Sequence, residues 1–452
     1  MDTERALAKE DARTASTVFE NSTKGSWYLV SLCMVAYIFS FIDRQIVVLL
    51  VEEIRADLHI SDTQFSLIHG LSFAIFYALM GLPIARLADT RSRPAIIAVG
   101  IAVWSAATAA CGLTRSFWQL FVARMAVGAG EAALSPAAYS MISDSFPRSQ
   151  LGLALGVYSI GSFIGAGLAF VTGGVAIQWV TTHLGVVDIA GVGTIKPWQM
   201  TFFIVGLPGL ILAALFLITV KDPQRKGATS GQNGYPLREV MDYLKLNRRT
   251  FFAHYVGFGL LSLQLFALLS WAPAFLLRNY DMSTREVGLT LGTIVLVCNV
   301  LGVLCSGWLL DLLTRRGHTD AALRSAMFGA LGSLIPVTLF PFVDQFELML
   351  VVLGLALFFA SFPMATSAAA LQAMAPNQMR AQVTAIFFLF MNLLGITGGA
   401  SLVALCTDYL FRDEMAVGFS MALVAFFSGV LALWVIASGL NAFRETVEKV
   451  DV

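Results

Sequence analysis

Residues 27–51 read WYLVSLCMVAYIFSFIDRQIVVLLV, an apolar run whose only charged residues are Asp43 and Arg44. A helix of about 20 apolar residues crosses a bilayer, so this run predicts a transmembrane span. An acid and a base inside a span are costly unless they face a partner or a water-filled cavity. The pair therefore predicts an ion or proton site within a membrane protein.

The composition of the whole chain agrees with this prediction. Hydrophobic residues make up 57% of the 452 residues and charged residues only 13%, whereas a soluble domain averages about 25% charged residues. The 29 basic and 29 acidic residues balance, so nucleic acid is not an expected partner. The five cysteines are scattered through apolar segments and fit neither a disulfide framework nor a zinc spacing. We therefore expect no metal and no cofactor.

Twelve segments are long and apolar enough to span a bilayer, which predicts an all-α polytopic membrane protein with twelve transmembrane helices. The predicted spans cover residues 27–51, 62–86, 95–114, 117–143, 149–179, 200–220, 250–277, 285–311, 321–343, 346–374, 380–407 and 414–440. The segment between the fifth and sixth spans, residues 180–199, is apolar for a loop and is expected to form a lid or a hairpin.

The positive charges predict the orientation of these spans. Most of the 29 Lys and Arg residues lie in the two terminal segments and in the loops that would share their side of the membrane. Cytoplasmic loops are enriched in Lys and Arg. We therefore expect an integral protein of the cell (inner) membrane with both termini in the cytoplasm.

Two loops on the predicted cytoplasmic side repeat one pattern, small-x-x-x-Asp-x-x-x-Arg. We expect the carboxylates to interact favourably with helix dipoles at helix N-termini. We expect the arginines to bind carboxylates of the facing bundle, so that each loop acts as a conformational latch. The alternative is that the two loops are ordinary basic turns. The pattern is occupied by Ala85, Asp89 and Arg93 in the first copy and by Gly307, Asp311, Arg315 and Arg316 in the second.

The repeat predicts two six-helix bundles of similar structure. A charged segment lies between them and is expected to act as a linker. The predicted parts are a cytoplasmic N-terminal tail (1–26), the first bundle (27–220), a cytoplasmic linker (221–249), the second bundle (250–440) and a cytoplasmic C-terminal tail (441–452).

Four charged residues lie inside predicted spans: Asp43, Arg44, Arg124 and Glu131. Arg124 and Glu131 are seven residues apart and share one helix face. We expect Asp43 and Glu131 to be proton-coupling carboxylates, and Asp43 to be the principal one because Arg44 and Arg124 can both compete for it. Burial opposes a charged carboxylate and a nearby arginine favours it. Either arginine could instead bind an anionic headgroup. The structural alternative is a buried salt-bridge cluster that fixes helix packing.

These residues carry a resemblance to a known family. The two half-chain repeats resemble the major facilitator superfamily, although Ala85 and Pro94 replace the usual glycine and second base of the first loop. FIDRQ at residues 41–45 and RMAVGAGEAA at residues 124–133 are similar to the spinster branch. The resemblance implies alternating access. Animal members of that branch export sphingosine-1-phosphate and lysophospholipids, and bacterial members are proposed to be proton-coupled.

The expected function is secondary active transport of an amphipathic anionic substrate such as a lysophospholipid or a sphingolipid-like molecule. Its expected partners are this substrate, protons and the lipid bilayer, and the expected state is a monomer. The first alternative is a proton-coupled transporter of small organic anions or drugs. The second is a membrane-embedded enzyme or a transport-dead sensor. The sequence has no Walker A, HExxH or GxSxG motif, which argues against an enzyme. His69 and His254 are expected to pack or to cap their helices.

Overall fold

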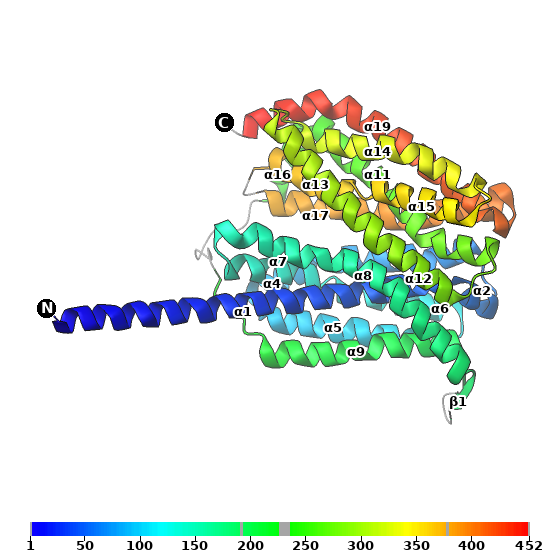
Figure 1. Ribbon diagram of the computed structural model, residues 1–452, viewed down its shortest axis with the longest axis horizontal. Coiled ribbons are helices and arrows are strands. Elements are labelled where there is room, and N and C mark those ends of the chain that lie inside the picture. Colours follow the sequence, from blue (N-terminus) through cyan, green and yellow to red (C-terminus); the bar gives the residue numbers. More distant parts are fainter. Residues whose placement is uncertain (1, 190–192, 226–235, 377–378, 451–452) are drawn as a thin grey trace.

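The computed structural model describes residues 2–189, 193–225, 236–376 and 379–450, and these are almost entirely helical (Figure 1). The elements before the linker are α1 (Asp2–Leu49), α2 (Val51–Leu58), α3 (Asp62–Ser66), η1 (Leu67–Leu71), α4 (Ser72–Thr90), α5 (Arg93–Cys111), α6 (Phe117–Glu131), α7 (Leu134–Ser145), α8 (Arg148–His183), β1 (Val187–Ile189), β2 (Gly193–Ile195) and α9 (Pro197–Thr219).

The second part of the chain is also built of helices. Its elements are α10 (Leu237–Leu246), α11 (Arg248–Asn279), α12 (Thr284–Ile294), η2 (Val295–Asn299), α13 (Val300–Arg315), α14 (Ala321–Leu339), η3 (Phe340–Phe342), α15 (Phe346–Ala360), α16 (Pro363–Met374), α17 (Arg380–Phe390), η4 (Met391–Gly398), α18 (Gly399–Leu405), η5 (Cys406–Phe411), η6 (Glu414–Ala416) and α19 (Val417–Val450). The elements η1, η2, η4 and η5 are π-helical turns, and η3 and η6 are 3₁₀ turns.

Among the described residues, eleven helical segments are long and apolar enough to cross a membrane on their own. The remaining predicted span, residues 117–143, is broken at Ala132 and Ala133 into α6 and α7. Each piece is shorter than a span, and α6 carries Arg124 and Glu131. With this pair counted as one span, the predicted twelve-helix fold is confirmed.

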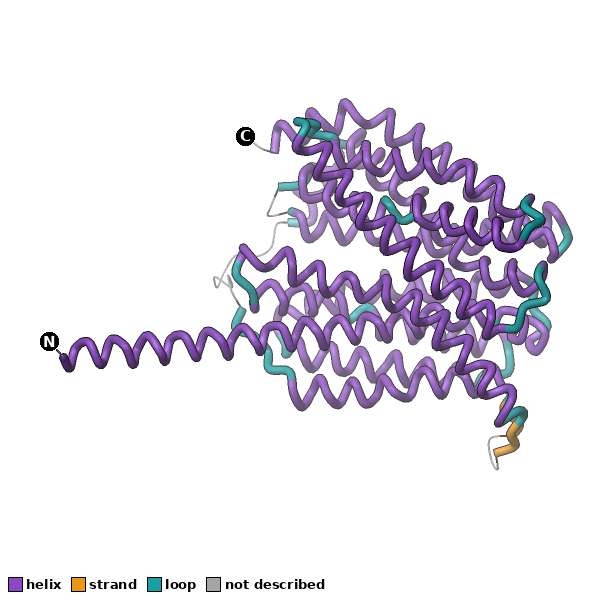
Figure 2. Tube along the Cα trace, in the orientation of Figure 1, coloured by secondary structure: helices purple, strands orange, loops and turns teal. Residues whose placement is uncertain are grey.

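The helices form two groups that lie side by side, α1 to α9 and α11 to α19 (Figure 1). Both chain termini lie at the same end of the molecule, which we call the tail end; the opposite end is the far end. The helix α1 begins at Asp2 and extends well beyond the bundle at the tail end (Figure 2). The N-terminal segment is thus a continuation of the first transmembrane helix.

The loop between α8 and α9 contains a short hairpin at the far end. Val187 of β1 pairs with Ile195 of β2 in an antiparallel register. The Thr194 hydroxyl donates a hydrogen bond to the Asp188 carboxylate over 2.6 Å. Of the two shapes expected for this segment, the structure has the hairpin.

The two groups contact most closely between α8 and α12, toward the far end. A Cβ on Gly288 would collide with the carbonyl oxygen of Phe170, and one on Gly174 would lie 2.9 Å from the carbonyl oxygen of Thr284. Small residues are the usual means by which membrane helices approach this closely. We call the contact the glycine seam; its glycines are Gly167, Gly174, Gly288 and Gly292.

Candidate functional site

Glu131, at the end of α6, is held by two donors from α1. Arg44 Nη2 lies 2.6 Å from Glu131 Oε2, and the Ser40 hydroxyl donates to the same oxygen over 2.6 Å. Residues four apart on a helix share a face, so one carboxylate can accept from both donors. Arg44 is 7% exposed and Glu131 is 1% exposed, so this is a buried ion pair.

The Asp43 carboxylate lies apart from this ion pair. Successive helical residues point about 100° apart, so the side chains of Asp43 and Arg44 diverge. Arg124 Nη1 donates to the backbone oxygen of Asp43 over 3.0 Å. Within the described chain, Asp43 Oδ1 is buried and has no hydrogen-bond partner, and no ion pair joins its carboxylate to an arginine. In this state neither arginine forms an ion pair with the Asp43 carboxylate among the described residues, and the competition of both arginines for Asp43 stays a prediction.

Close helix packing explains why these charges are buried. A Cβ on Gly128 would collide with the backbone of Phe73 in α4, and one on Gly130 would lie 2.6 Å from the backbone nitrogen of Trp104 in α5. The glycines therefore let α6 lie directly against α4 and α5. Arg124 and Glu131, on the same helix, are carried into the interior with it.

Aromatic rings surround the guanidinium of Arg44. Its central carbon lies 4.2 Å from the ring centroid of Phe73, 4.8 Å from that of Phe41 and 5.7 Å from that of Tyr77. A cation within about 6 Å of a ring centroid is attracted by the ring quadrupole. The rings and Glu131 together hold the Arg44 guanidinium in one place.

Several polar atoms of this charge cluster (Asp43, Arg44, Arg124 and Glu131) remain unused. Within the described part of the chain, no hydrogen bond reaches Arg124 Nε, Arg124 Nη2, Arg44 Nε or Glu131 Oε1. Leaving such a buried group without a partner is costly. The free nitrogens can bind an anionic oxygen or water, and the free carboxylate oxygens can accept a proton.

His69 joins the two halves of the molecule rather than capping its helix. Its side chain is 2% exposed, and Nε2 lies 3.2 Å from the Ser270 hydroxyl of α11. His69 lies within η1, a π-helical turn, and such turns are frequent at functional sites. His254, by contrast, packs within its own half, with Nε2 3.0 Å from the carbonyl oxygen of Ser367.

A network of charges joins the halves at the far end. Arg278 binds Asp62 and Glu52, each over 2.8 Å, and Arg55 binds Glu414 over 2.6 Å. We call these five residues the far-end network. This network could not be predicted from the sequence, because its side chains are far apart in sequence. The one hint in the sequence is that acidic and basic residues both flank the predicted spans of each half.

The described side-chain hydrogen bonds between the halves all lie in the far-end part of the molecule. Beyond the far-end network they join Thr63 to Asp408, Ser66 to Ser401, His69 to Ser270 and Thr284 to Glu53. Toward the tail end of α8, a Cβ on Gly156 would meet no atom within 4 Å. The halves are therefore fastened at the far end.

The first predicted latch residue, Arg93, is 1% exposed and binds carboxylates of its own half. Its guanidinium donates to Asp144 of α7 and, over 2.8 Å, to Asp222 after α9. The predicted contact with the facing bundle is therefore wrong for Arg93 in this state, because α7 and the end of α9 lie directly beside α5. The side chain of Asp89 lies outside the described part of the structure.

In the second latch copy, the predicted charges are solvent-facing. Asp311, Arg315 and Arg316 are exposed, and within the described residues none has a side-chain hydrogen bond or ion pair. The nearby buried charge is Asp320, which accepts hydrogen bonds from Arg324 over 2.8 Å and from Arg444 over 2.6 Å. The structure therefore does not join the second copy to the facing half.

Comparisons with known proteins agree with this architecture. The Major Facilitator Superfamily matches residues 33–400. An MFS-type efflux pump of Mycolicibacterium smegmatis is 28% identical over 437 residues, which cover 94% of this chain and 95% of the pump. The probable sphingolipid transporter spinster homolog 2 of Arabidopsis thaliana is 28% identical over 263 residues, 55% of this chain and 49% of that protein.

A solved structure shares the fold. It is a bacterial homolog to the human lysosomal transporter spinster, in an inward-facing and unoccupied conformation. It aligns with a TM-score of 0.75 at 21% identity and covers 94% of this chain and 97% of its own. The resemblance to the superfamily and to spinster proteins is thereby confirmed. Because the family match extends over most of the chain, this protein belongs to the Major Facilitator Superfamily of membrane transporters.

Proposed function

We propose that this transporter is proton-coupled and moves an amphipathic anionic substrate, such as a lysophospholipid or a sphingolipid-like molecule, across the cell (inner) membrane. The bundles, residues 27–220 and 250–440, rock against each other about a bound substrate, and residues 221–249 link them. The protein works as a monomer. Both termini are cytoplasmic, so the tail end faces the cytoplasm. The fastened far end then makes this an inward-facing state.

The charge cluster supports the coupling. Arg44 is neutralised by Glu131, whereas the buried Asp43 carboxylate has no ion-pair partner among the described residues. A buried carboxylate without a partner favours its protonated form, and an approaching cation reverses that preference. Asp43 therefore loads a proton in this state. It releases the proton when rearrangement brings the free nitrogens of Arg124 to its carboxylate.

The same arginines support an anionic substrate. Arg124 has two unused donors, and Arg44 binds a carboxylate oxygen of Glu131. A guanidinium binds carboxylates and phosphates through paired hydrogen bonds. The relative named as a probable sphingolipid transporter favours a lipid. The efflux pump that matches nearly the whole chain favours the second candidate, small organic anions or drugs.

Transport into sealed vesicles with an imposed pH gradient tests the coupling. The assay compares lysophospholipids with small organic anions. We expect gradient-driven accumulation by the unmodified protein and its loss in Asp43→Asn, with substrate binding and thermal stability retained. Glu445→Gln is the control, because it removes an exposed carboxylate that lies outside the charge cluster. If Asp43→Asn follows the gradient as the unmodified protein does, the coupling role is wrong and the cluster only fixes packing.

A further inference from the structure

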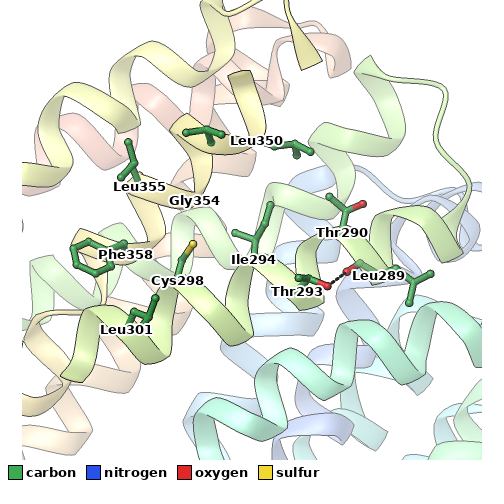
Figure 3. A pocket seen from close by; sticks show the side chains of 11 residues that line it. Leu289, Thr290, Thr293, Ile294, Cys298, Leu301, Leu350, Gly354, Leu355 and Phe358 are labelled. Atoms are coloured by element: carbon green, nitrogen blue, oxygen red, sulfur yellow. Dashed lines mark hydrogen bonds between the residues drawn. The ribbon is translucent and has the colours of Figure 1, made fainter. Parts of the chain in front are cut away.

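A second candidate binding site lies outside the charge cluster, on the surface of the second half. It is a groove of about 720 Å³ between the helix α12–η2–α13 and the helix α15. Figure 3 shows Ile294 and Cys298 facing Gly354 and Phe358 across it. Aliphatic and aromatic side chains dominate its lining.

The shape of α12 explains why the groove is open. At the far end, α12 packs through the glycine seam against α8 of the other half rather than against α15. The π-helical turn η2 follows, after which α13 returns to the second half and packs on α15 and α16. A helix that leans away in this manner leaves apolar side chains uncovered, and Leu301 at the edge of the groove is 48% exposed.

The apolar groove continues into a polar rim at the far end. A second cavity of about 550 Å³ shares Leu289 and Thr290 with the groove. Its lining includes Tyr280, Asp281 and Glu286, and Ser283 donates two hydrogen bonds to Oε2 of Glu286. No basic residue contributes to this lining among the described residues; the neighbouring Arg285 is exposed and its charge acts on Glu286, which leaves Asp281 as the main acidic group of the rim. The rim is therefore acidic.

We propose that this groove binds an amphiphile with a single alkyl chain and a cationic amine headgroup. The acidic rim is complementary to an ammonium, and the groove is complementary to a hydrocarbon chain. Between Leu289 and Leu301 the helix rises about 18 Å at 1.5 Å per residue. That length is close to one leaflet, or half of the ~30 Å hydrocarbon core. The ligand differs in charge from the anion expected at the charge cluster, so the two sites are distinct.

Photolabelling in lipid vesicles tests the site with two probes. The first is a long-chain alkylamine with a diazirine in its chain, and the second is the fatty acid of the same chain with the same diazirine. We expect the amine to label 289–301 and 350–358, and to do so about two- to fivefold more than the acid, the effect of one exposed ion pair. Equal labelling by both probes means general lipid contact and overturns the proposal.

Two pairs of variants separate the groove from the rim. Cys298→Trp fills the groove and should abolish labelling, whereas Val297→Trp should not, because Val297 is 50% exposed and does not line the groove. Asp281→Asn should remove the preference for the amine. Asp281 has a positive φ of 45°, a conformation that asparagine tolerates. Glu445→Gln, at the tail end, should leave the preference intact. Unchanged amine preference in Asp281→Asn would contradict the assigned headgroup site.

Discussion

Arg278 and Asp62 form a two-pronged ion pair between the halves, with each Nη nitrogen 2.8 Å from a carboxylate oxygen. Their side chains are 5% and 0% exposed. Arg55 Nε also lies 2.9 Å from Asp62, so loss of Arg278 leaves this buried carboxylate with one of its two cations. Breaking a buried pair costs up to about 3–5 kcal/mol, and the remaining arginine reduces that cost. The closed far end therefore depends on this contact more than on the exposed charges around it.

We predict that Arg278→Gln opens the far end. Spin labels placed on the far-end loops of the two halves should show longer distances, because Arg278 is the arginine that ties Asp62 and Glu52 to the second half, whereas Arg55 belongs to their own half. Lys245→Gln is the control, since its pair with Asp242 is exposed and within one helix. An unchanged distance distribution in Arg278→Gln would show that the glycine seam alone holds this end closed.

Gly288→Val should have a similar effect for a steric reason. Its side chain would collide with the carbonyl oxygen of Phe170, and a backbone atom cannot move aside as a flexible side chain can. We expect the variant to populate the state in which the far end is open, measured with the same spin labels. Gly307→Val is the matched control, because a Cβ there meets no atom within 4 Å. Equal distances in both variants would exclude the seam as a determinant of closure.

Glu131→Gln should shift the pH dependence of transport rather than abolish folding. The amide keeps the shape of the carboxylate and can still accept hydrogen bonds from Ser40 and Arg44, but it cannot neutralise Arg44. Initial rates of substrate accumulation should therefore depend on pH differently from those of the unmodified protein. A pH profile that superimposes on the unmodified one would mean that Glu131 does not exchange protons during transport.

Asp320 should give a pH-dependent contribution to stability outside the membrane. Burial alone would raise the pKa of this carboxyl, but hydrogen bonds from Arg444 and Arg324 outweigh burial and hold its pKa below the ordinary value. A carboxyl whose pKa is lower in the folded protein stabilises the fold at pH values above its pKa in the unfolded chain, about 3.9. This stabilisation is lost as the pH falls through the pKa of the carboxyl in the folded protein. Asp320→Asn should cost about 1–2 kcal/mol at neutral pH and progressively less in acid. Thermal unfolding across this range measures the effect, and an equal loss at every pH would contradict it.

Orientation can be tested by cysteine labelling in a cysteine-free background. Ser92→Cys lies at the tail end and should react with an impermeant maleimide only from the cytoplasmic side. Leu184→Cys lies near the far-end hairpin, is 40% exposed and should react only from the opposite side. The reverse pattern would overturn the orientation drawn from the positive charges.

The transmembrane helices could be predicted from the sequence because the bilayer imposes a length and a composition on each span. The predicted eighth span, 285–311, lies within the helix that runs from Thr284 to Arg315. The charge cluster could be foreseen for a similar reason: charges inside a span are rare and must find partners. Their joint burial in one bundle was therefore expected.

The partners themselves could not be predicted. Asp43 and Arg44 are adjacent in sequence, but the turn of the helix directs them to different neighbours, and only helix packing decides that Arg44 meets Glu131. Arg93 illustrates the same limit, because the ends of α7 and α9 reach it before the other half does. The π-helical turn at His69 depends on tertiary contacts that no local sequence pattern records.

The π-helical turns have a consequence for how this chain tolerates insertions and deletions. A π-helical turn holds one residue more than an α-helical turn, so it shifts the rotational phase of everything that follows by about 100°. Loss of a single residue within 67–71 would restore an ordinary helix and turn one end of the span to a new face. In such a helix, the number of residues in one turn sets the direction of every side chain that follows. A one-residue deletion therefore reorients more side chains than most substitutions do.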